Sequence, residues 1–191
     1  MYTYLLFDLD GTLTDSRIGI TNSVMHALRK FGIKVEDRSR LYPFIGPPLR
    51  ESFRKYFGLT PEESEKAVAY YREYFSVTGL FENEVYPGIP ALLEELRRRG
   101  KKLITATSKP EVYTVKIMRH FGLDQYFDTV AGATMDETRV TKTDVIRYAL
   151  EIAGITDRRE AVMIGDREND ILGARENGLA SIGGHYGFGS R

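Results

Sequence analysis

The 191-residue sequence contains no cysteine, which excludes disulfide bonds, thiolate nucleophiles and cysteine-ligated zinc. It has no excess charge of either sign, because 27 lysine and arginine residues balance 27 aspartate and glutamate residues. A nucleic-acid-binding surface would need a basic stripe, so we expect no nucleic-acid partner. A neutral chain can nevertheless bind a small anion, because a local positive site does not require a positive protein.

Long apolar segments are also absent. No run approaches the length of a membrane span, so we expect no membrane partner. The N-terminal segment from Met1 to Asp8 lacks the basic start and the long apolar stretch of a signal peptide. We therefore expect a soluble, cytoplasmic protein.

The chain does contain short apolar runs that are typical of buried parallel strands. They lie at residues 4–7, 103–107, 129–132, 161–165 and 179–182. Helical patterns separate the later runs, so strand and helix alternate from about residue 85 onward. This alternation predicts an α/β fold with a Rossmann-like parallel sheet.

Residues 16–84 show no buried-strand run, and their periodicity predicts helices at residues 18–31, 49–57 and 62–77. Thr60, Pro61 and Glu63 form a capping-box start for the third helix. Several helices are too large for an ordinary strand-to-strand crossover. We therefore predict a catalytic core of residues 1–14 and 85–191, with an inserted all-helical cap domain of residues 15–84.

Two acids end the first predicted strand. Asp8 and Asp10 are two residues apart, so on extended backbone they face the same spot. That spot lies at the carboxyl edge of the sheet, where open α/β sheets bind ligands. Gly11 then permits a tight turn and a close approach of the backbone. Taken alone, the acids and glycine could equally well just terminate a strand.

A second acidic group follows the fourth predicted strand. Asp166 should share the edge of the sheet with the first pair, and Asp170 lies at the start of a helix. Acids at a helix start often serve only as caps, and we expect that role for Glu168 or Asn169. It does not explain Asp166, which precedes the turn. Oxygen ligands gathered at one edge suit Mg²⁺.

Two further segments could bind an anion. Thr107 and Ser108 follow the second predicted strand, and a helix start is a ready anion site. We expect Ser108 to form a capping box with Glu111 while Thr107 faces the anion. Lys142 lies in the first turn of a later helix, where it opposes the helix dipole unless it points at a bound anion.

Taken together, these motifs resemble the haloacid dehalogenase superfamily, and the resemblance covers nearly the whole chain. The sequence is most similar to phosphoglycolate-phosphatase-like members, whose type 1 cap matches the helical insertion. The motifs occur in the order Asp8-Leu9-Asp10-Gly11-Thr12, Thr107, Lys142, and Gly165-Asp166 with Asp170.

The resemblance implies a Mg²⁺-dependent phosphatase that acts on a small phosphorylated metabolite. Asp8 would attack phosphorus to form an aspartyl-phosphate, and Asp10 would act as general acid and then base. Thr107 and Lys142 would hold the phosphoryl oxygens. The residues implied in Mg²⁺ binding are Asp8, Asp10, Asp166 and Asp170, and the implied substrate-binding residues are Gly11, Thr12, Ser108 and Arg50.

The presence of Asp10 favours phosphate chemistry, because the dehalogenases of the superfamily replace this residue. Phosphoglycolate is the first expected substrate, with 5′-nucleotides or sugar phosphates as alternatives. Arg50 could meet a second anionic group, although an exposed arginine early in a helix is at least as common. Tyr71 and Phe75, with their aromatic neighbours, are expected to form the packed core of the cap. We expect a monomer or a homodimer.

A different class of protein shares part of this pattern. Receiver domains of response regulators also combine an aspartyl-phosphate, Mg²⁺, a threonine or serine and a lysine on a parallel sheet. They accept phosphate on a later strand, however, and they need neither a general acid such as Asp10 nor a helical lid. The hydrolase is therefore the favoured interpretation.

Overall fold

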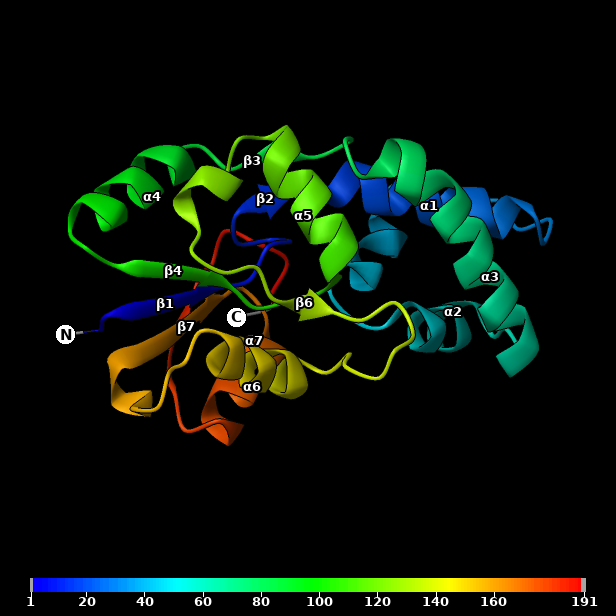
Figure 1. The fold of residues 1–191 in the computed structure, drawn as a ribbon. Helices are drawn as coiled ribbons and strands as arrows, with labels where there is room; N and C mark the ends of the chain where they lie inside the picture. Colours follow the sequence, from blue (N-terminus) through cyan, green and yellow to red (C-terminus); the bar gives the residue numbers. More distant parts are fainter. Residues whose placement is uncertain (1, 190–191) are drawn as a thin grey trace. The chain divides into compact units, whose positions relative to one another are not determined.

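The computed structural model describes residues 2–189, and these residues form two compact units (Figure 1). The first unit comprises the chain up to Asp15 together with the chain from Val85 onward, and the second runs from Ser16 to Glu84. We call the second the helical unit. The boundary falls at two short strands that pair with each other, β2 (Thr14–Asp15) and β3 (Glu84–Val85).

The first unit is built on a parallel sheet with the strand order β4-β1-β7-β8. Phe7 of β1 lies between Thr105 of β4 and Ile164 of β7 in a continuous register. The four strands are β1 (Tyr4–Phe7), β4 (Lys102–Thr105), β7 (Ala161–Gly165) and β8 (Ala180–Gly183). The predicted α/β fold with a parallel sheet is therefore confirmed.

Two shorter strands continue the sheet beyond β4. β5 (Thr107–Pro110) pairs in parallel with β6 (Gly132–Ala133), and a bridge joins Ile104 to Thr129 just before them. The segment predicted as the third strand therefore lies beside the second. The five predicted strand segments are arranged in the doubly wound order 3-2-1-4-5, which places the switch in strand order between β1 and β7.

Helices cover both faces of this sheet, α4 and α5 on one and α6 and α7 on the other (Figure 1). Their bounds are α4 (Ile89–Arg98), α5 (Glu111–His120), α6 (Lys142–Ile152) and α7 (Glu168–Glu176). The face under α6 and α7 carries a continuous apolar core, in which Leu6, Ile104 and Met163 of the strands pack with Ile146 and Leu150 of α6. This core anchors the strand ends that bear the acidic motifs.

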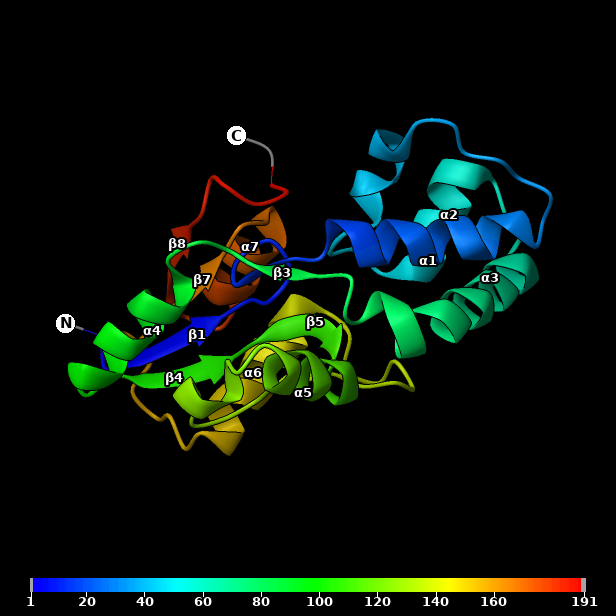
Figure 2. The same ribbon diagram turned by 90° about the horizontal axis from the view of Figure 1, so that it is seen from above.

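The helical unit consists of three α-helices and two irregular turns of helix. Figure 2 shows α1 running alongside α3, and the two helices are in contact. The elements are α1 (Arg17–Arg29), the 3-10 helix η1 (Arg38–Phe44), α2 (Leu49–Phe57), α3 (Pro61–Tyr74) and the π-helix η2 (Phe75–Gly79). The aromatic core predicted here is present, because Tyr71 and Phe75 stack at 5.1 Å and are both buried.

The predicted ends of these helices are partly right. α2 has the predicted bounds, and α3 begins with the predicted capping box, in which Thr60 accepts from the Glu63 amide and Glu63 accepts from the Thr60 amide. The α-helix ends at Tyr74, however, and a π-turn replaces the predicted continuation to residue 77. None of the helices within residues 2–189 combines the length and apolar character that a bilayer span needs.

Candidate active site

The acidic motif after β1 lies in a tight loop whose main chain closes on itself. Asp8 still belongs to the ladder of the sheet, because its amide donates to the Ile164 carbonyl at 2.9 Å. The chain then turns, and the Gly11 amide donates to the Thr14 carbonyl at 2.8 Å. Asp8 and Asp10 are both buried at this turn. Both acids of the predicted pair therefore lie buried just after the carboxyl end of β1.

Gly11 is required at this turn for two reasons. Its φ of +89° lies in the left-handed region that L-residues with a side chain rarely adopt. A Cβ atom there would also lie 2.4 Å from Oδ2 of Asp166. The glycine therefore lets the loop after β1 approach the acid that follows β7.

Lys142 joins the loop after β1 to the start of α7. Its ammonium lies 2.8 Å from Oδ1 of Asp8 and 2.8 Å from Oδ1 of Asp170, and it donates to the Ala106 carbonyl at 3.0 Å. All of these side chains are buried. Lys142 is the first residue of α6, and Thr141 caps the helix through its hydroxyl, which accepts from the Asp144 amide. A lysine in the first turn of a helix is unfavourable at the surface, but Lys142 is buried there and contacts two carboxylates.

The electrostatics of this lysine follow from two opposing causes. Burial alone would lower the pKa of Lys142, because it disfavours the charged form. The carboxylates of Asp8 and Asp170 outweigh that effect and hold the pKa above its ordinary value. Lys142 is therefore a permanent positive charge at the centre of the site.

Three of the acids form a cluster that can hold a metal ion. Among the residues that the structure describes, one carboxylate oxygen from each of Asp8, Asp166 and Asp170 lies within 4.8 Å of the others. Burial, together with the charge of Asp8, raises the pKa of Asp166. Burial also raises the pKa of Asp170 to about 6, although Lys142 opposes this. Lys142 pairs with two of these three carboxylates, so the cluster carries surplus negative charge, which a hard divalent cation would neutralise.

The two oxygens of the Asp170 carboxylate have different partners. Its Oδ2 accepts from the amide of Arg167 at 2.9 Å, which caps the first turn of α7. Its Oδ1 faces Lys142. We had assigned the capping role to Glu168 or Asn169, and that expectation was wrong, because Asp170 stands at the third position of the helix, where a capping-box acid belongs.

The segment after β4 brings a residue that sequence reasoning missed. Lys109 is buried, and its ammonium lies 2.8 Å from Oδ2 of Asp10. Oδ1 of Asp10 is buried as well and has no hydrogen-bond partner among the described residues. One signal could have revealed Lys109: it is two residues after Thr107 on extended backbone, so the two side chains lie on the same face of β5.

Ser108 lies on the other face of β5, between Thr107 and Lys109. The expected capping box with Glu111 does not form, because β5 stays extended to Pro110 and Pro110 is the N-cap of α5. The Glu111 carboxylate instead accepts from the Gly132 amide at 3.3 Å. Thr107 is buried, and its hydroxyl accepts from the Lys109 amide at 3.2 Å.

Two predicted residues have other surroundings. Thr12 is buried, and its hydroxyl donates to Oδ1 of Asp166 at 3.5 Å. Arg50 belongs to the helical unit, where its guanidinium lies 3.3 Å from the Glu65 carboxylate near the start of α2. Arg50 is thus part of a surface ion pair within its own unit.

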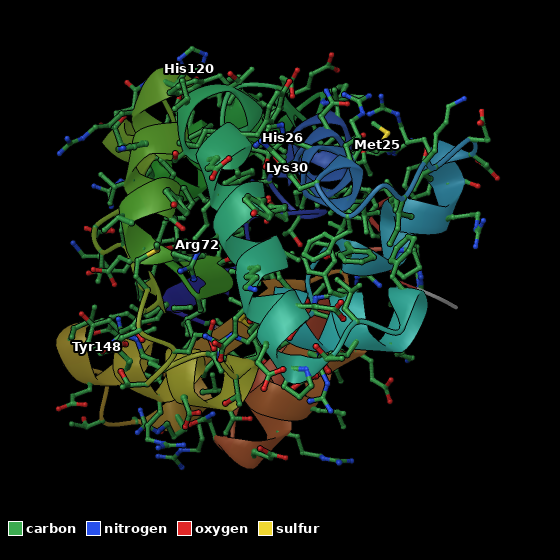
Figure 3. The ribbon with its side chains drawn as sticks, turned by 90° about the vertical axis from the view of Figure 1, so that its right-hand side faces the viewer. Met25, His26, Lys30, Arg72, His120 and Tyr148 are labelled. Carbon is green, nitrogen blue, oxygen red and sulfur yellow. The ribbon has the colours of Figure 1, made fainter. Side chains whose placement is uncertain are left out.

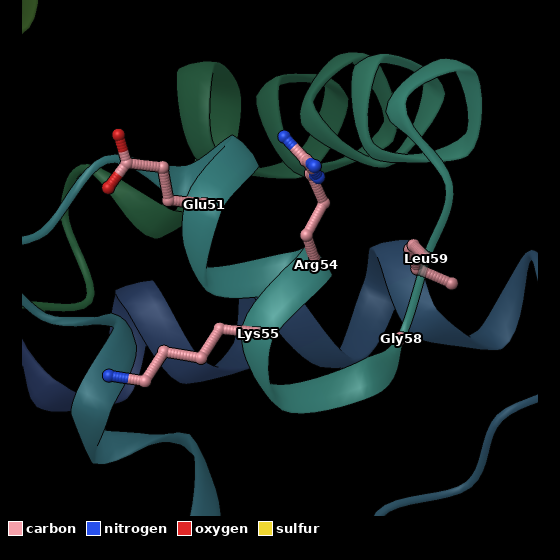
Figure 4. Close-up of a pocket in the computed structure, with 5 residues that line it drawn as sticks. All are labelled: Glu51, Arg54, Lys55, Gly58 and Leu59. Atoms are coloured by element: carbon pink, nitrogen blue, oxygen red, sulfur yellow. The ribbon is translucent and has the colours of Figure 1, made fainter.

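Other polar features of the molecule lie outside the candidate site. His26 of α1, labelled in Figure 3, stacks on Tyr74 and lies 3.4 Å from the Glu73 carboxylate within the helical unit. An open surface pocket also lies wholly on the helical unit (Figure 4). Its lining residues are Glu51, Arg54, Lys55, Gly58 and Leu59. None of them belongs to the predicted site.

Comparison with known proteins gives a family and several relatives. The model of the family described as haloacid dehalogenase-like hydrolase matches residues 5–183. A 5′-nucleotidase of Pseudomonas aeruginosa is 50% identical over 189 residues, which cover 99% of this chain and 85% of that protein. A predicted phosphatase from Clostridium acetobutylicum has a crystal structure with a TM-score of 0.95 and 53% identity, covering 100% of this chain and 88% of that one.

A relative with a different activity in its name is also similar. The tyrosine-protein kinase PtkA of Mycobacterium tuberculosis is 40% identical over 186 residues, which cover 97% of this chain and 62% of that protein. More than a third of the kinase therefore has no counterpart here, and the kinase activity is said of that protein alone.

Proposed function

We propose that this chain, which belongs to the haloacid dehalogenase-like hydrolases, requires Mg²⁺ and forms an aspartyl-phosphate on Asp8. The premise is that it is a phosphate-monoester hydrolase of that family. The observation that carries this proposal is the position of the Asp8 carboxylate. It is buried, it lies 2.8 Å from the Lys142 ammonium, and Asp166 and Asp170 complete an acidic cluster around it. Membership of a hydrolase family also favours turnover over the receiver-type signalling role.

The main obstacle to the reaction is like charge. At about 4 Å and an effective dielectric of about 20, a carboxylate and one phosphate charge repel by roughly 4 kcal/mol. Lys142 offsets this repulsion, because its ammonium is fixed between Asp8 and Asp170 before the substrate arrives. Such preorganised charge needs no rearrangement at the moment of reaction. Thr107 is proposed to hold a second phosphoryl oxygen.

The residues also fit a resident Mg²⁺ ion. Asp8 and Asp166 would bind the ion through carboxylate oxygens, and the Asp10 carbonyl would add a main-chain oxygen. Asp170 would support these ligands without binding the ion directly. The fit rests on hard oxygen donors and on the surplus negative charge of the cluster. When bound, Mg²⁺ supplies positive charge to the transferring phosphoryl group.

Asp10 supplies the proton transfers on both sides of the intermediate. In the first step an oxygen of Asp8 attacks phosphorus, the bond from phosphorus to the ester oxygen breaks, and that oxygen takes a proton from Asp10. In the second step Asp10 takes a proton from water, whose oxygen attacks phosphorus and releases the Asp8 carboxylate. Splitting hydrolysis in this way needs one group to act as acid and then base. Lys109 holds Asp10 at this position through the 2.8 Å ion pair.

For the substrate we propose a 5′-nucleotide first and phosphoglycolate second. The support for the nucleotide is the 50% identity with the Pseudomonas aeruginosa 5′-nucleotidase, which outweighs the earlier expectation of phosphoglycolate. We propose that the helical unit chooses between them, and that Arg50 leaves its ion pair with Glu65 to meet a second anionic group. Gly11 and Thr12 remain proposed contacts of the phosphoryl group, whereas Ser108 is no longer proposed as one because it lies on the other face of β5 from Thr107. A cytoplasmic monomer or homodimer remains our expectation.

The proposal is tested by measuring release of inorganic phosphate from a panel of 5′-nucleotides, phosphoglycolate and sugar phosphates. Each substrate is assayed with Mg²⁺ and with EDTA. We expect turnover that depends on Mg²⁺, with a 5′-nucleotide giving the highest kcat/KM. Equal turnover in EDTA would contradict the role of Mg²⁺, and no turnover across the panel would contradict the proposed hydrolysis.

A further inference from the structure

The segment Gly184–Gly189, which we call the strap, lies against the acidic cluster of the first unit. It begins by extending the ladder of β8, because the Gly184 amide donates to the Gly165 carbonyl at 2.8 Å. From there it passes Asp166 and the loop after β1. None of the sequence motifs predicted a role for it, and the proposed reaction does not use it.

The strap makes a direct hydrogen bond to an acid of the cluster. The main-chain amide of Phe188 donates to Oδ2 of Asp166 at 2.5 Å. The other oxygen of the same carboxylate accepts from the hydroxyl of Thr12 at 3.5 Å. Asp166 is 8% exposed, and these two donors fix the orientation of its carboxylate.

Glycines explain how the strap comes so close. A Cβ atom on Gly187 would lie 2.3 Å from Oδ2 of Asp166 and 2.3 Å from the Gly11 carbonyl. A Cβ atom on Gly189 would lie 1.8 Å from the main-chain oxygen of Asp166. Glycine on either side of Phe188 thus allows its amide to reach the carboxylate, which a side chain at either position would prevent.

A tyrosine ties the strap to the loop after β1. The hydroxyl of Tyr186 donates to the carbonyl of Thr12 at 2.8 Å, and its ring meets Tyr86 edge-on at 5.1 Å. The strap therefore links two parts of the site: the loop that carries Asp8 and Asp10, and the acid that follows β7.

We propose that the strap is a positioning element for the metal ligand Asp166, and that it sets the affinity of the site for Mg²⁺. This inference rests on the proposed function, because Asp166 is a ligand only if the site holds Mg²⁺. A carboxylate ligand needs a partner that fixes its orientation, and such partners influence metal affinity strongly. The Phe188 amide is that partner, and Tyr186 keeps the amide in place.

Two substitutions test the strap in the substrate-free full chain, with the dissociation constant of MgCl₂ measured by isothermal titration calorimetry. Gly187→Ala would push the strap away from Asp166, and we expect it to weaken Mg²⁺ binding by about 10–100-fold. Tyr186→Phe removes one anchoring hydrogen bond, and we expect a loss of about twofold to tenfold. Circular dichroism and thermal unfolding establish that each variant is folded. If Gly187→Ala does not fold, Tyr186→Phe decides.

Each variant has a matched control. Gly183→Ala adds a Cβ atom on β8 that would meet only the end of the Ile171 side chain, at an ordinary 3.9 Å. Tyr74→Phe removes a hydroxyl that donates to Glu82 at 3.0 Å in the helical unit. We expect both controls to bind Mg²⁺ within about twofold of the unaltered chain.

The outcomes separate the strap from the proposed function. Saturable Mg²⁺ binding by the unaltered chain, with no difference in either strap variant, would overturn the strap inference and leave the proposed function intact. Tighter binding in Gly187→Ala would also overturn it, because the strap would then compete with the metal. Absence of Mg²⁺ binding by the unaltered chain would overturn both.

Discussion

The ion pairs of the candidate site differ from the ion pair of Arg50 in the helical unit in how far they are exposed to solvent. In the first unit Lys142 bridges Asp8 and Asp170. The side chain of Lys142 is 6% exposed, that of Asp8 is 9% exposed and that of Asp170 is 0% exposed. In the helical unit the ion pair of Arg50 and Glu65 has side chains that are 46% and 61% exposed. The same pairing of a cationic group with a carboxylate is thus buried at the candidate site and solvated in the helical unit, as it also is at surface pairs of the first unit such as Arg159 with Asp157.

This contrast distinguishes a reaction centre from a surface. Burying charges costs several kcal/mol for each ion, and a fold seldom retains a buried cluster for stability alone. An exposed pair contributes about 0–1 kcal/mol and constrains little. The buried cluster therefore marks the candidate site in the first unit, whereas the Arg50–Glu65 pair of the helical unit lies at the surface.

The sharpest test of the contrast is the nucleophile. Asp8→Asn keeps the size of the side chain but removes its ability to attack phosphorus, so we expect kcat to fall by about 10⁴-fold or more. The measurement is steady-state phosphate release at saturating Mg²⁺. Asp157→Asn, an exposed acid paired with Arg159, is the matched control and should keep full activity. An Asp8→Asn variant with normal kcat would remove Asp8 from the mechanism.

The second test breaks the buried ion pairs themselves. Lys142→Met leaves two buried carboxylates without their cation, and we expect the free energy of unfolding to fall by about 3–5 kcal/mol in EDTA. Lys102→Met breaks an ion pair with Asp128, whose side chains are 54% and 25% exposed, and should cost about 0–1 kcal/mol. Urea unfolding measures both variants. Equal losses of unfolding free energy in the two variants would mean that burial does not make the Lys142 ion pairs contribute more than the exposed Lys102 pair.

A smaller effect is expected at Lys109, which positions Asp10. General acid–base catalysis contributes about 10²–10⁴-fold, and we expect Lys109→Met to lose about 10–100-fold of kcat. In an Asp10→Asn background the same substitution should cost little more, because both changes act through one group. Lys101→Met, which removes a surface hydrogen bond to the Tyr2 carbonyl, controls for the loss of a lysine. Additive losses would show that Lys109 acts independently of Asp10.

The smallest predicted effect belongs to the helical unit. If Arg50 meets a second anionic group of the substrate, Arg50→Ala should raise KM by about threefold to tenfold and leave kcat unchanged. Glu65→Ala breaks the same surface ion pair from the other side and should leave KM unaltered. Identical KM values for the two variants would show that Arg50 does not contact the substrate and only forms the surface ion pair with Glu65.

Much of the first unit could be predicted because its signals are local. Each buried strand is a short apolar run, and two of the site acids, Asp8 and Asp166, directly follow such runs. Lys142 was recognisable because a lysine in the first turn of a helix opposes the dipole. The parallel arrangement of the sheet then brings these distant residues to one edge.

The rest depends on backbone geometry that composition does not reveal. Lys109 reaches Asp10 only because residues 107–110 stay extended, whereas the predicted strand run ends at Thr107. The same extension explains why Ser108 does not cap α5. The π-turn at Phe75–Gly79 was missed because its apolar spacing also fits an α-helix. The strap was missed because the role of Phe188 lies in its main-chain amide, which has no sequence signal of its own.

The central claim is that Asp8 carries the phosphoryl group during turnover. Borohydride reduces an acyl phosphate to an alcohol, so the chain can be quenched with it during turnover of its best substrate and then mapped by peptide mass spectrometry. We predict that the reduced product is found at Asp8, that it requires both Mg²⁺ and substrate, and that it is absent from the Asp8→Asn variant. Steady turnover with an unmodified Asp8 peptide, or with reduction at another acid, would contradict the proposed mechanism.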